Sequence, residues 1–273
     1  MKRSNMIIFI LLNKTYKMAG VNELTVSYGQ LNVKPTHFEL VGEFHDIFGH
    51  PLRTEPYMEC FTEDKKIVPF RVSLINEELN EFKDALSNKD LKEMADALCD
   101  MSYVINGAGH CLGLNVDEAL AHRNYDITTK AGVHVDNLYL QNNVFDIPDD
   151  NFVTNAITNM QDIIKCFEQQ YIEHNICNME FYLIFLLNKV YSIGHSLGFN
   201  MDLMFREVHR SNMTKVCANI EDANKSVEIY KNDGRYAEPS INIKGQYYVV
   251  YDAKTSKILK NYKWEVPNVS QFF

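Results

Sequence analysis

Apolar residues recur at helical spacing along most of this chain, and the pattern is clearest in two consecutive segments, 70–87 and 91–110. The two apolar stripes consist of Ile75, Leu79, Phe82 and Leu86, and of Leu91, Met94, Leu98, Met101 and Ile105. Steps of three and four residues place each stripe on one face of an α-helix. Because only the short stretch SNKD connects the segments, we expect the two helices to pack antiparallel through their stripes.

The same periodicity predicts further helices on both sides of this pair. They cover HFELVGEFHDIFGHP (37–51), about 116–125, 152–174, 179–197, and a stretch that ends near Val216. The tail differs, because GQYYVVYD (245–252) and SKILKNYKW (256–264) are β-prone and AKT separates them, which predicts a hairpin. The predicted fold class is all-α, a helical bundle with a short C-terminal β-hairpin tail.

A nine-residue motif occurs twice, as GHCLGLNVD (109–117) and GHSLGFNMD (194–202), at a constant offset of 85. Both copies follow one predicted helix and precede another, which favours duplication over chance. We therefore expect two tandem degenerate repeats that form a pseudo-dimer. The predicted organisation is an irregular or disordered extension (1–35), a first helical repeat (36–130), a linker (131–151), a degenerate repeat (152–216) and a tail (217–273).

Composition limits the partners and the compartment. The formal net charge of −9 argues against nucleic-acid binding, but a metal ion would still bridge the acidic surface to a small phosphorylated ligand. The apolar run Met6–Leu12 is too short to span a bilayer, so no membrane partner is expected. The six cysteines are scattered without a CxxC pair, which favours reduced residues in a cytoplasmic protein.

Acidic residues flank the apolar stripes of the two clearest helices. They form two groups with matching spacing: Glu77, Glu78 and Glu81 on the first helix, and Glu93, Asp96 and Asp100 on the second. Residues three, four or seven apart lie on the same helix face, so antiparallel packing brings both groups to one edge of the seam. Carboxylates gathered in this way repel each other, so either their pKa values rise or a cation neutralises them.

Hard oxygen ligands in this number suit Mg²⁺, with Mn²⁺ as the alternative, although an acidic helix face can also be simply solvated. An offset of 85 leads from Glu78, Glu81, Glu93, Asp96 and Asp100 to Ile163, Cys166, Asn178, Phe181 and Phe185. The second repeat has therefore lost every one of these acids. Such asymmetry favours a functional role for the first repeat, with the second as its support.

These motifs resemble those of the all-α nucleotide pyrophosphatases, which include MazG-type enzymes, dimeric dUTPases and phosphoribosyl-ATP pyrophosphohydrolases. The shared pattern is ExxE followed by ExxD and apolar residues, here EELNE (77–81) and EMADALCDMSYVI (93–105). Phosphoribosyl-ATP pyrophosphohydrolase-like proteins of phages and large viruses are more similar still. They share EFHDIFGHP (43–51), EVHRSNMTK (207–215) and a tail like DGR…KILKNYKWEVPNV (233–269).

The resemblance implies Mg²⁺-dependent hydrolysis of a nucleoside triphosphate between the α and β phosphates, giving the monophosphate and pyrophosphate. It implies Glu78, Glu81, Glu93 and Asp96 as metal ligands. Glu77 and Asp100 are then candidate catalytic residues that support a ligand or orient the attacking water. The candidate substrate-binding residues are His209, Arg210, Asn212, Lys215 and Lys260, of which the arginine and the lysines suit phosphate.

In single-domain relatives the EVHRSNMxK segment follows soon after the ExxD helix, whereas this chain has AHRNYDITTK (121–130) there and the full motif only after the second repeat. We expect a fused dimer with divided roles, and a homodimer of the pseudo-dimer remains open. Trp264 would stack a base or form a small hydrophobic staple, and Arg71 would pair with the acids or lie on the surface. The alternative functions are a catalytically silent nucleotide-binding protein and a helical dimerisation module.

Overall fold

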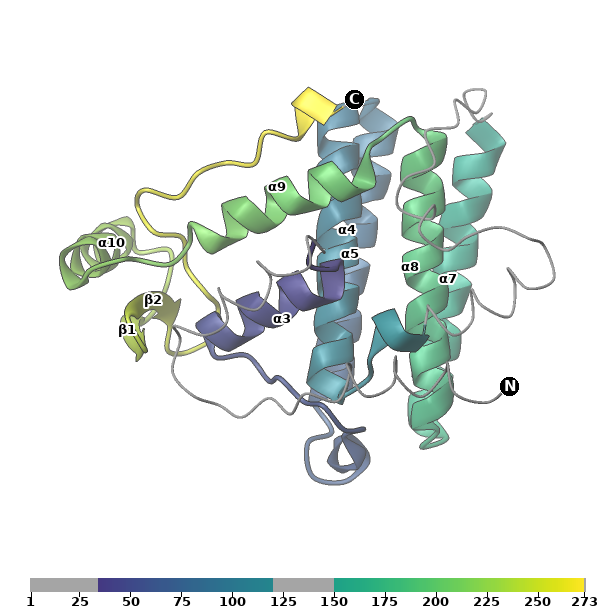
Figure 1. Ribbon diagram of the computed structural model, residues 1–273, viewed down its shortest axis with the longest axis horizontal. Coiled ribbons are helices and arrows are strands. Elements are labelled where there is room, and N and C mark those ends of the chain that lie inside the picture. Colours follow the sequence, from purple (N-terminus) through teal and green to yellow (C-terminus); the bar gives the residue numbers. More distant parts are fainter. Residues whose placement is uncertain (1–33, 120–149, 273) are drawn as a thin grey trace, which may run out of the picture. The chain divides into compact units, whose positions relative to one another are not determined.

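The computed structural model describes residues 34–119 and 150–272. Nearly all of the predicted N-terminal extension, most of the predicted linker and the AHRNYDITTK segment lie outside these ranges. The described elements belong to one compact unit, Thr36–Phe273. It is mostly helical and carries a two-stranded antiparallel sheet near the C-terminus, which confirms the predicted fold class (Figure 1).

The two helices with the clearest stripes are α4 (Ile67–Asn88) and α5 (Leu91–Leu112), which pack against each other along their length. Most residues of the two apolar stripes are buried, as predicted, with Phe82 and Leu98 fully inaccessible to solvent; Leu86 is half-buried, and Leu91, at the start of α5, is exposed. Asp90 begins α5 as its N-cap, because its carboxylate accepts hydrogen bonds from two amides of the first turn.

Two shorter helices, α3 (His37–Phe48) and α9 (Met201–Met213), cross α5 and contact each other (Figure 1). A capping box between Thr36 and Glu39 starts α3, and Gly49 ends it with a φ of 75° that disfavours other residues. This arrangement lays the last turns of α9 beside the acidic side of α5.

The remaining long helices are α7 (Asp150–Ile172), which packs on α4, and α8 (Ile176–Ser196), which packs on α5. The two copies of the nine-residue motif make similar turns after α5 and α8. Gly113 and Gly198 both have positive φ, and Asn115 and Asn200 each accept a hydrogen bond from the amide three residues later. The similarity supports the duplication, which itself stays a prediction.

The tail contains a helix that the sequence did not predict, α10 (Ile220–Asp233), followed by β1 (Pro239–Lys244) and β2 (Tyr247–Asp252). The predicted hairpin is present, but its main partner strand was wrong: β2 pairs with the preceding β1 through a turn at Gly245. Residues 256–264 add only one isolated bridge to β2, between Ile258 and Tyr251.

Helix α10 and the hairpin enclose a small second core of Cys217, Ala223, Val250 and Leu259. Beyond it, residues 259–269, which we call the strap, return along α9 towards the ends of α4 and α5 (Figure 1). Across the described ranges, every helix is too short or too polar to cross a membrane.

Candidate active site

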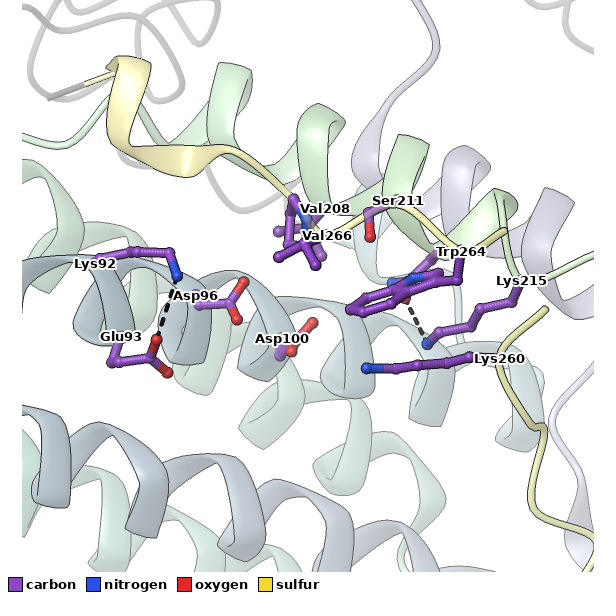
Figure 2. Close-up of a pocket in the computed structure, with 12 residues that line it drawn as sticks. Lys92, Glu93, Asp96, Asp100, Val208, Ser211, Lys215, Lys260, Trp264 and Val266 are labelled. Atoms are coloured by element: carbon purple, nitrogen blue, oxygen red, sulfur yellow. Dashed lines mark hydrogen bonds and ion pairs between the residues drawn. The ribbon is translucent and has the colours of Figure 1, made fainter. Parts of the chain in front are cut away.

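A pocket of about 210 Å³ lies between α5, α9 and the strap (Figure 2). Its lining residues are Lys92, Glu93, Asp96 and Asp100 of α5, Val208, Ser211 and Asn212 of α9, then Lys215, and Lys260, Trp264, Val266 and Pro267 of the strap. One wall is therefore acidic, one end is basic, and the side formed by the strap is largely apolar. Half of the acids predicted from the sequence share this pocket with three of the predicted substrate-binding residues.

The acidic wall is electrostatically strained. The pKa of Asp100 is raised to about 7. Burial is the largest cause and the Asp96 carboxylate the next, while the nearby Lys215 ammonium lowers the pKa. The pKa of Asp96 is also raised, first by burial and then by Glu93. A bound cation would relieve the repulsion that disfavours the charged form of both carboxylates.

The acids of α4 act on the same region from the neighbouring helix. Burial raises the pKa of Glu78 to about 9, and Asp100 is the strongest of the four carboxylates that add to the shift. The pKa of Glu81 is raised by burial and then by Glu77 and Asp96. The acids of the two helices therefore lie close enough to raise one another's pKa values, as their predicted convergence requires. Glu77 itself is exposed, and the α4 acids do not line the pocket.

The fit of a divalent cation can be judged from the oxygen atoms. Within residues 34–119 and 150–272, no three Asp, Glu, His or Cys side chains stand close enough to hold a metal ion as they are now placed. Yet Glu78 Oε2 and Asp96 Oδ1 are buried and have no hydrogen-bond partner. Two orphaned carboxylate oxygens among mutually repelling acids match the donor chemistry of Mg²⁺ or Mn²⁺. The carboxylates therefore have the right donor atoms for such a cation, but their side chains would have to move closer together to bind it.

The basic end of the pocket comes from the C-terminal part of the chain. Burial lowers the pKa of Lys215, and Asp100 partly restores it. Asn212 Oδ1 accepts a hydrogen bond from Lys215 Nζ at 2.7 Å, so the amide orients the ammonium. Lys260 is exposed, and its ammonium lies 3.3 Å from the centre of the Trp264 ring (Figure 2). Both lysines face the acids of α5, so the pocket presents cations and carboxylates to the same ligand.

Two predicted substrate-binding residues make contacts elsewhere. Arg210 forms ion pairs with Glu207 and Glu265, and it does not line the pocket. His209 is buried, with Nδ1 hydrogen-bonded to Tyr103 Oη at 3.1 Å and Nε2 3.4 Å from Glu43 Oε2. In this structure both hold neighbouring elements together.

The strap is fastened to α9 by several polar links that the sequence did not reveal. Ser211 Oγ donates to the Glu265 carbonyl at 2.6 Å, and the Glu265 amide donates to Thr214 Oγ1 at 3.0 Å. Farther along, the Asn268 amide donates to Glu207 Oε1 at 2.9 Å. These partners are more than forty residues apart in the chain, so only the EVHRSNMTK and tail motifs hinted that the segments meet.

Arg71 neither pairs with the acids nor lies on the surface, contrary to both predictions. It is 7% exposed, and its Nη2 donates to the Val104 carbonyl at 2.8 Å. The guanidinium lies against α5 where Gly107 has no side chain: a β-carbon there would be 2.3 Å from Arg71 Nη2 and 3.0 Å from His45 Nε2. Gly107 is therefore a packing requirement of this buried arginine.

At the corresponding face of the second repeat, aromatic rings stand where the first repeat has acids. Phe181 and Phe185 pack with ring centres 4.3 Å apart, and Phe185 is 40% exposed. The sequence leaves two interpretations for these rings, packing or base stacking, and their mutual contact agrees with packing. The acidic pocket has no carboxylate counterpart at these two positions.

Comparison with known proteins places this pocket in context. Residues 41–124 match the sequence profile of the family described as phosphoribosyl-ATP pyrophosphohydrolase. The chain is 32% identical over 246 residues to an uncharacterized protein of Acanthamoeba polyphaga mimivirus. The aligned region covers 87% of this chain and 95% of that protein. No solved structure matches the chain. The matched family segment contains all six acids, whereas Lys215, Lys260 and Trp264 of the pocket lie beyond it.

Proposed function

Because this chain belongs to the phosphoribosyl-ATP pyrophosphohydrolase family and has a relative in a large virus, we propose that it is a nucleoside triphosphate pyrophosphohydrolase. The reaction would add water to the α phosphorus and break its bond to the bridging oxygen of the β phosphate. The products would be a nucleoside monophosphate and pyrophosphate. Family membership supports pyrophosphate-bond hydrolysis in general, and the triphosphate substrate and the bond cleaved are our inference.

One observation carries this proposal: three carboxylates of α5 and two lysines from the C-terminal region line the same pocket. A triphosphate needs both kinds of group, cations for its oxygens and acids that hold a bridging metal ion. Neither an ordinary solvated acidic face nor a simple dimerisation surface needs lysines from a distant part of the chain beside partly buried acids.

Glu78, Glu81, Glu93 and Asp96 would hold Mg²⁺, or Mn²⁺ in its place. Two of them, Glu78 and Asp96, have the orphaned oxygens that support this assignment. When bound, the cation supplies charge neutralisation to the phosphates and acidifies coordinated water. Glu77 is exposed and would support these ligands from outside the pocket.

Asp100 is the carboxylate best suited to accept a proton from the attacking water. Its pKa of about 7 lies near the operating pH, where a general base combines sufficient ionisation with a real driving force for proton transfer. Lys215 and Lys260 would bind phosphate oxygens, with Asn212 holding Lys215 in position. Arg210 is not part of the proposed phosphate site, because its guanidinium forms ion pairs with Glu207 and Glu265.

The test is a panel of ribo- and deoxyribonucleoside triphosphates incubated with the protein and Mg²⁺, Mn²⁺ or a chelator, with products separated by chromatography. We expect monophosphate and pyrophosphate in equal amounts, and no turnover with chelator. Asp96→Asn serves as the inactive control. Diphosphate with orthophosphate as products would contradict cleavage between the α and β phosphates.

The same panel separates the alternative of a silent nucleotide-binding protein. Calorimetry that detects nucleotide binding, together with the absence of any product, would favour that alternative. A helical dimerisation module would show neither binding nor Mg²⁺-dependent stabilisation.

A further inference from the structure

Trp264 is the only tryptophan of the chain, and it lines the pocket from the strap. Val266, Pro267 and Val208 extend the same apolar side (Figure 2). The opposite wall is acidic, and Lys215 and Lys260 lie at one end (Figure 2). The pocket therefore offers an aromatic and aliphatic surface beside its groups for phosphate, and phosphate binding alone gives no reason for such a surface.

The indole carries an unused hydrogen-bond donor. Its Nε1 is buried and has no hydrogen-bond partner within the described part of the chain. Buried indole N–H groups normally find an acceptor, so an orphaned one at a pocket calls for a ligand that supplies it.

The backbone around Trp264 is fixed, which favours a recognition role. The Trp264 amide donates to the Asn261 carbonyl at 2.8 Å, and the next residue is bonded on both sides to α9 through Ser211 and Thr214. The Lys260 ammonium, 3.3 Å from the ring centre, covers part of the indole and is itself close to the acids of α5. A preorganised ring next to an exposed cation suits a ligand with a flat apolar part joined to an anionic part.

We propose that Trp264 recognises the base of the nucleotide, by stacking on its ring and by donating its indole N–H to a base acceptor. This inference rests on the proposed function, since it concerns the same pocket. The ligand class is a purine or pyrimidine nucleotide whose phosphates lie at Lys215 and Lys260. Base–aromatic stacking tolerates every base, so Trp264 separates nucleotides from baseless polyphosphates more strongly than one base from another.

Because Trp264 is the only tryptophan, its fluorescence reports on this pocket without any need for turnover. The probes are an α,β-methylene nucleoside triphosphate, which cannot be cleaved at that bond, and inorganic tripolyphosphate, which has no base. Both are titrated with Mg²⁺, and calorimetry establishes occupancy. We expect strong quenching by the nucleotide and little change with tripolyphosphate at equal occupancy. Equal responses to both probes, or none from a bound nucleotide, would overturn the proposal.

Variants then separate stacking from the hydrogen bond. Trp264→Ala should raise the KM for nucleotides about 5- to 150-fold and leave the KM for tripolyphosphate nearly unchanged. Trp264→Phe keeps an aromatic ring without the donor and should fall between wild type and Trp264→Ala. Tyr262→Ala is the matched control, because this exposed aromatic residue of the strap lies outside the pocket. It should leave both KM values unchanged.

The results distinguish failure of this inference from failure of the proposed function. Hydrolysis that proceeds with an unchanged nucleotide KM in Trp264→Ala would refute base recognition and leave the enzyme assignment intact. Nucleotide-specific quenching without hydrolysis would support Trp264 and remove the catalytic function. Calorimetry that detects no nucleotide binding would refute both.

Discussion

Replacing Glu78 by glutamine tests whether the acids are held together against their mutual repulsion. In the metal-free protein the pKa of Glu78 is raised from 4.5 to about 9, first by burial and then by Asp100. The folded state therefore keeps a proton that the unfolded chain releases above its ordinary pKa. The free energy of unfolding should fall as pH rises between these two values, by about 1.4 kcal/mol per pH unit.

At about pH 7.5 the accumulated cost of neutralising Glu78 comes to about 4 kcal/mol. Glutamine is similar in shape and has no proton to release, so Glu78→Gln should be more stable than wild type by nearly this amount. At about pH 4.5 the two proteins should differ little, because the wild-type carboxyl is then protonated in the folded state and about half protonated in the unfolded chain, which leaves a cost of only about 0.4 kcal/mol. The sign is unusual, since most substitutions of a partly buried residue destabilise.

The assay is urea unfolding of wild type and Glu78→Gln at both pH values, first with a chelator and then with Mg²⁺. Glu228→Gln, an exposed helical glutamate far along the chain, controls for the loss of one charge. Mg²⁺ should stabilise wild type and reduce the difference, because a bound cation favours the ionised carboxylate. A difference that is the same at both pH values would refute the reasoning, since it would show that the surroundings do not drive this carboxyl neutral.

Other changes probe the pocket and the core. Asp96→Asn should reduce pyrophosphate release below detection and leave the helical circular dichroism spectrum unchanged; measurable turnover would remove Asp96 from the metal set. Lys215→Met should raise the KM for nucleotide about 10- to 100-fold with a smaller effect on kcat, and kinetics identical to wild type would contradict the division of roles between the two ends of the chain. Gly107→Ala should lower the free energy of unfolding by about 1–3 kcal/mol, because the new β-carbon meets Arg71 Nη2. In an open helix this substitution normally stabilises, so a more stable variant in thermal melts would contradict the packing argument.

Helices were predictable from the sequence where burial follows a strict period. The stripe of Ile75, Leu79 and Phe82 is buried in α4 as expected. The helix ends at Asn88, in the stretch SNKD where the apolar period is interrupted. Helix α10 escaped notice because it buries little: Ile220 and Ile229 are exposed, and its buried side consists of small residues. A helix that rests on a small second core leaves a weak hydrophobic pattern.

The candidate site divides in the same way. The acids were predictable because their spacing on two helices is local information. The raised pKa values of Glu78, Glu81, Asp96 and Asp100 follow from burial and from that spacing. Helical period does not predict which distant segments meet, so Trp264 stayed between two interpretations and Arg210 was expected at phosphate. The partners of Arg210, Glu207 and Glu265, come from α9 and the strap.

The order in which the chain is synthesised gives the strap a particular importance. The acids of α4 and α5 are made well before Lys260 and Trp264, which lie more than 150 residues later in the chain. A nascent or prematurely terminated chain therefore exposes its acidic groups without the cations and the aromatic ring that complete the binding site. Nucleotide handling would begin only after the strap has been synthesised, so a frameshift just before the strap would silence the protein and leave every acid in place.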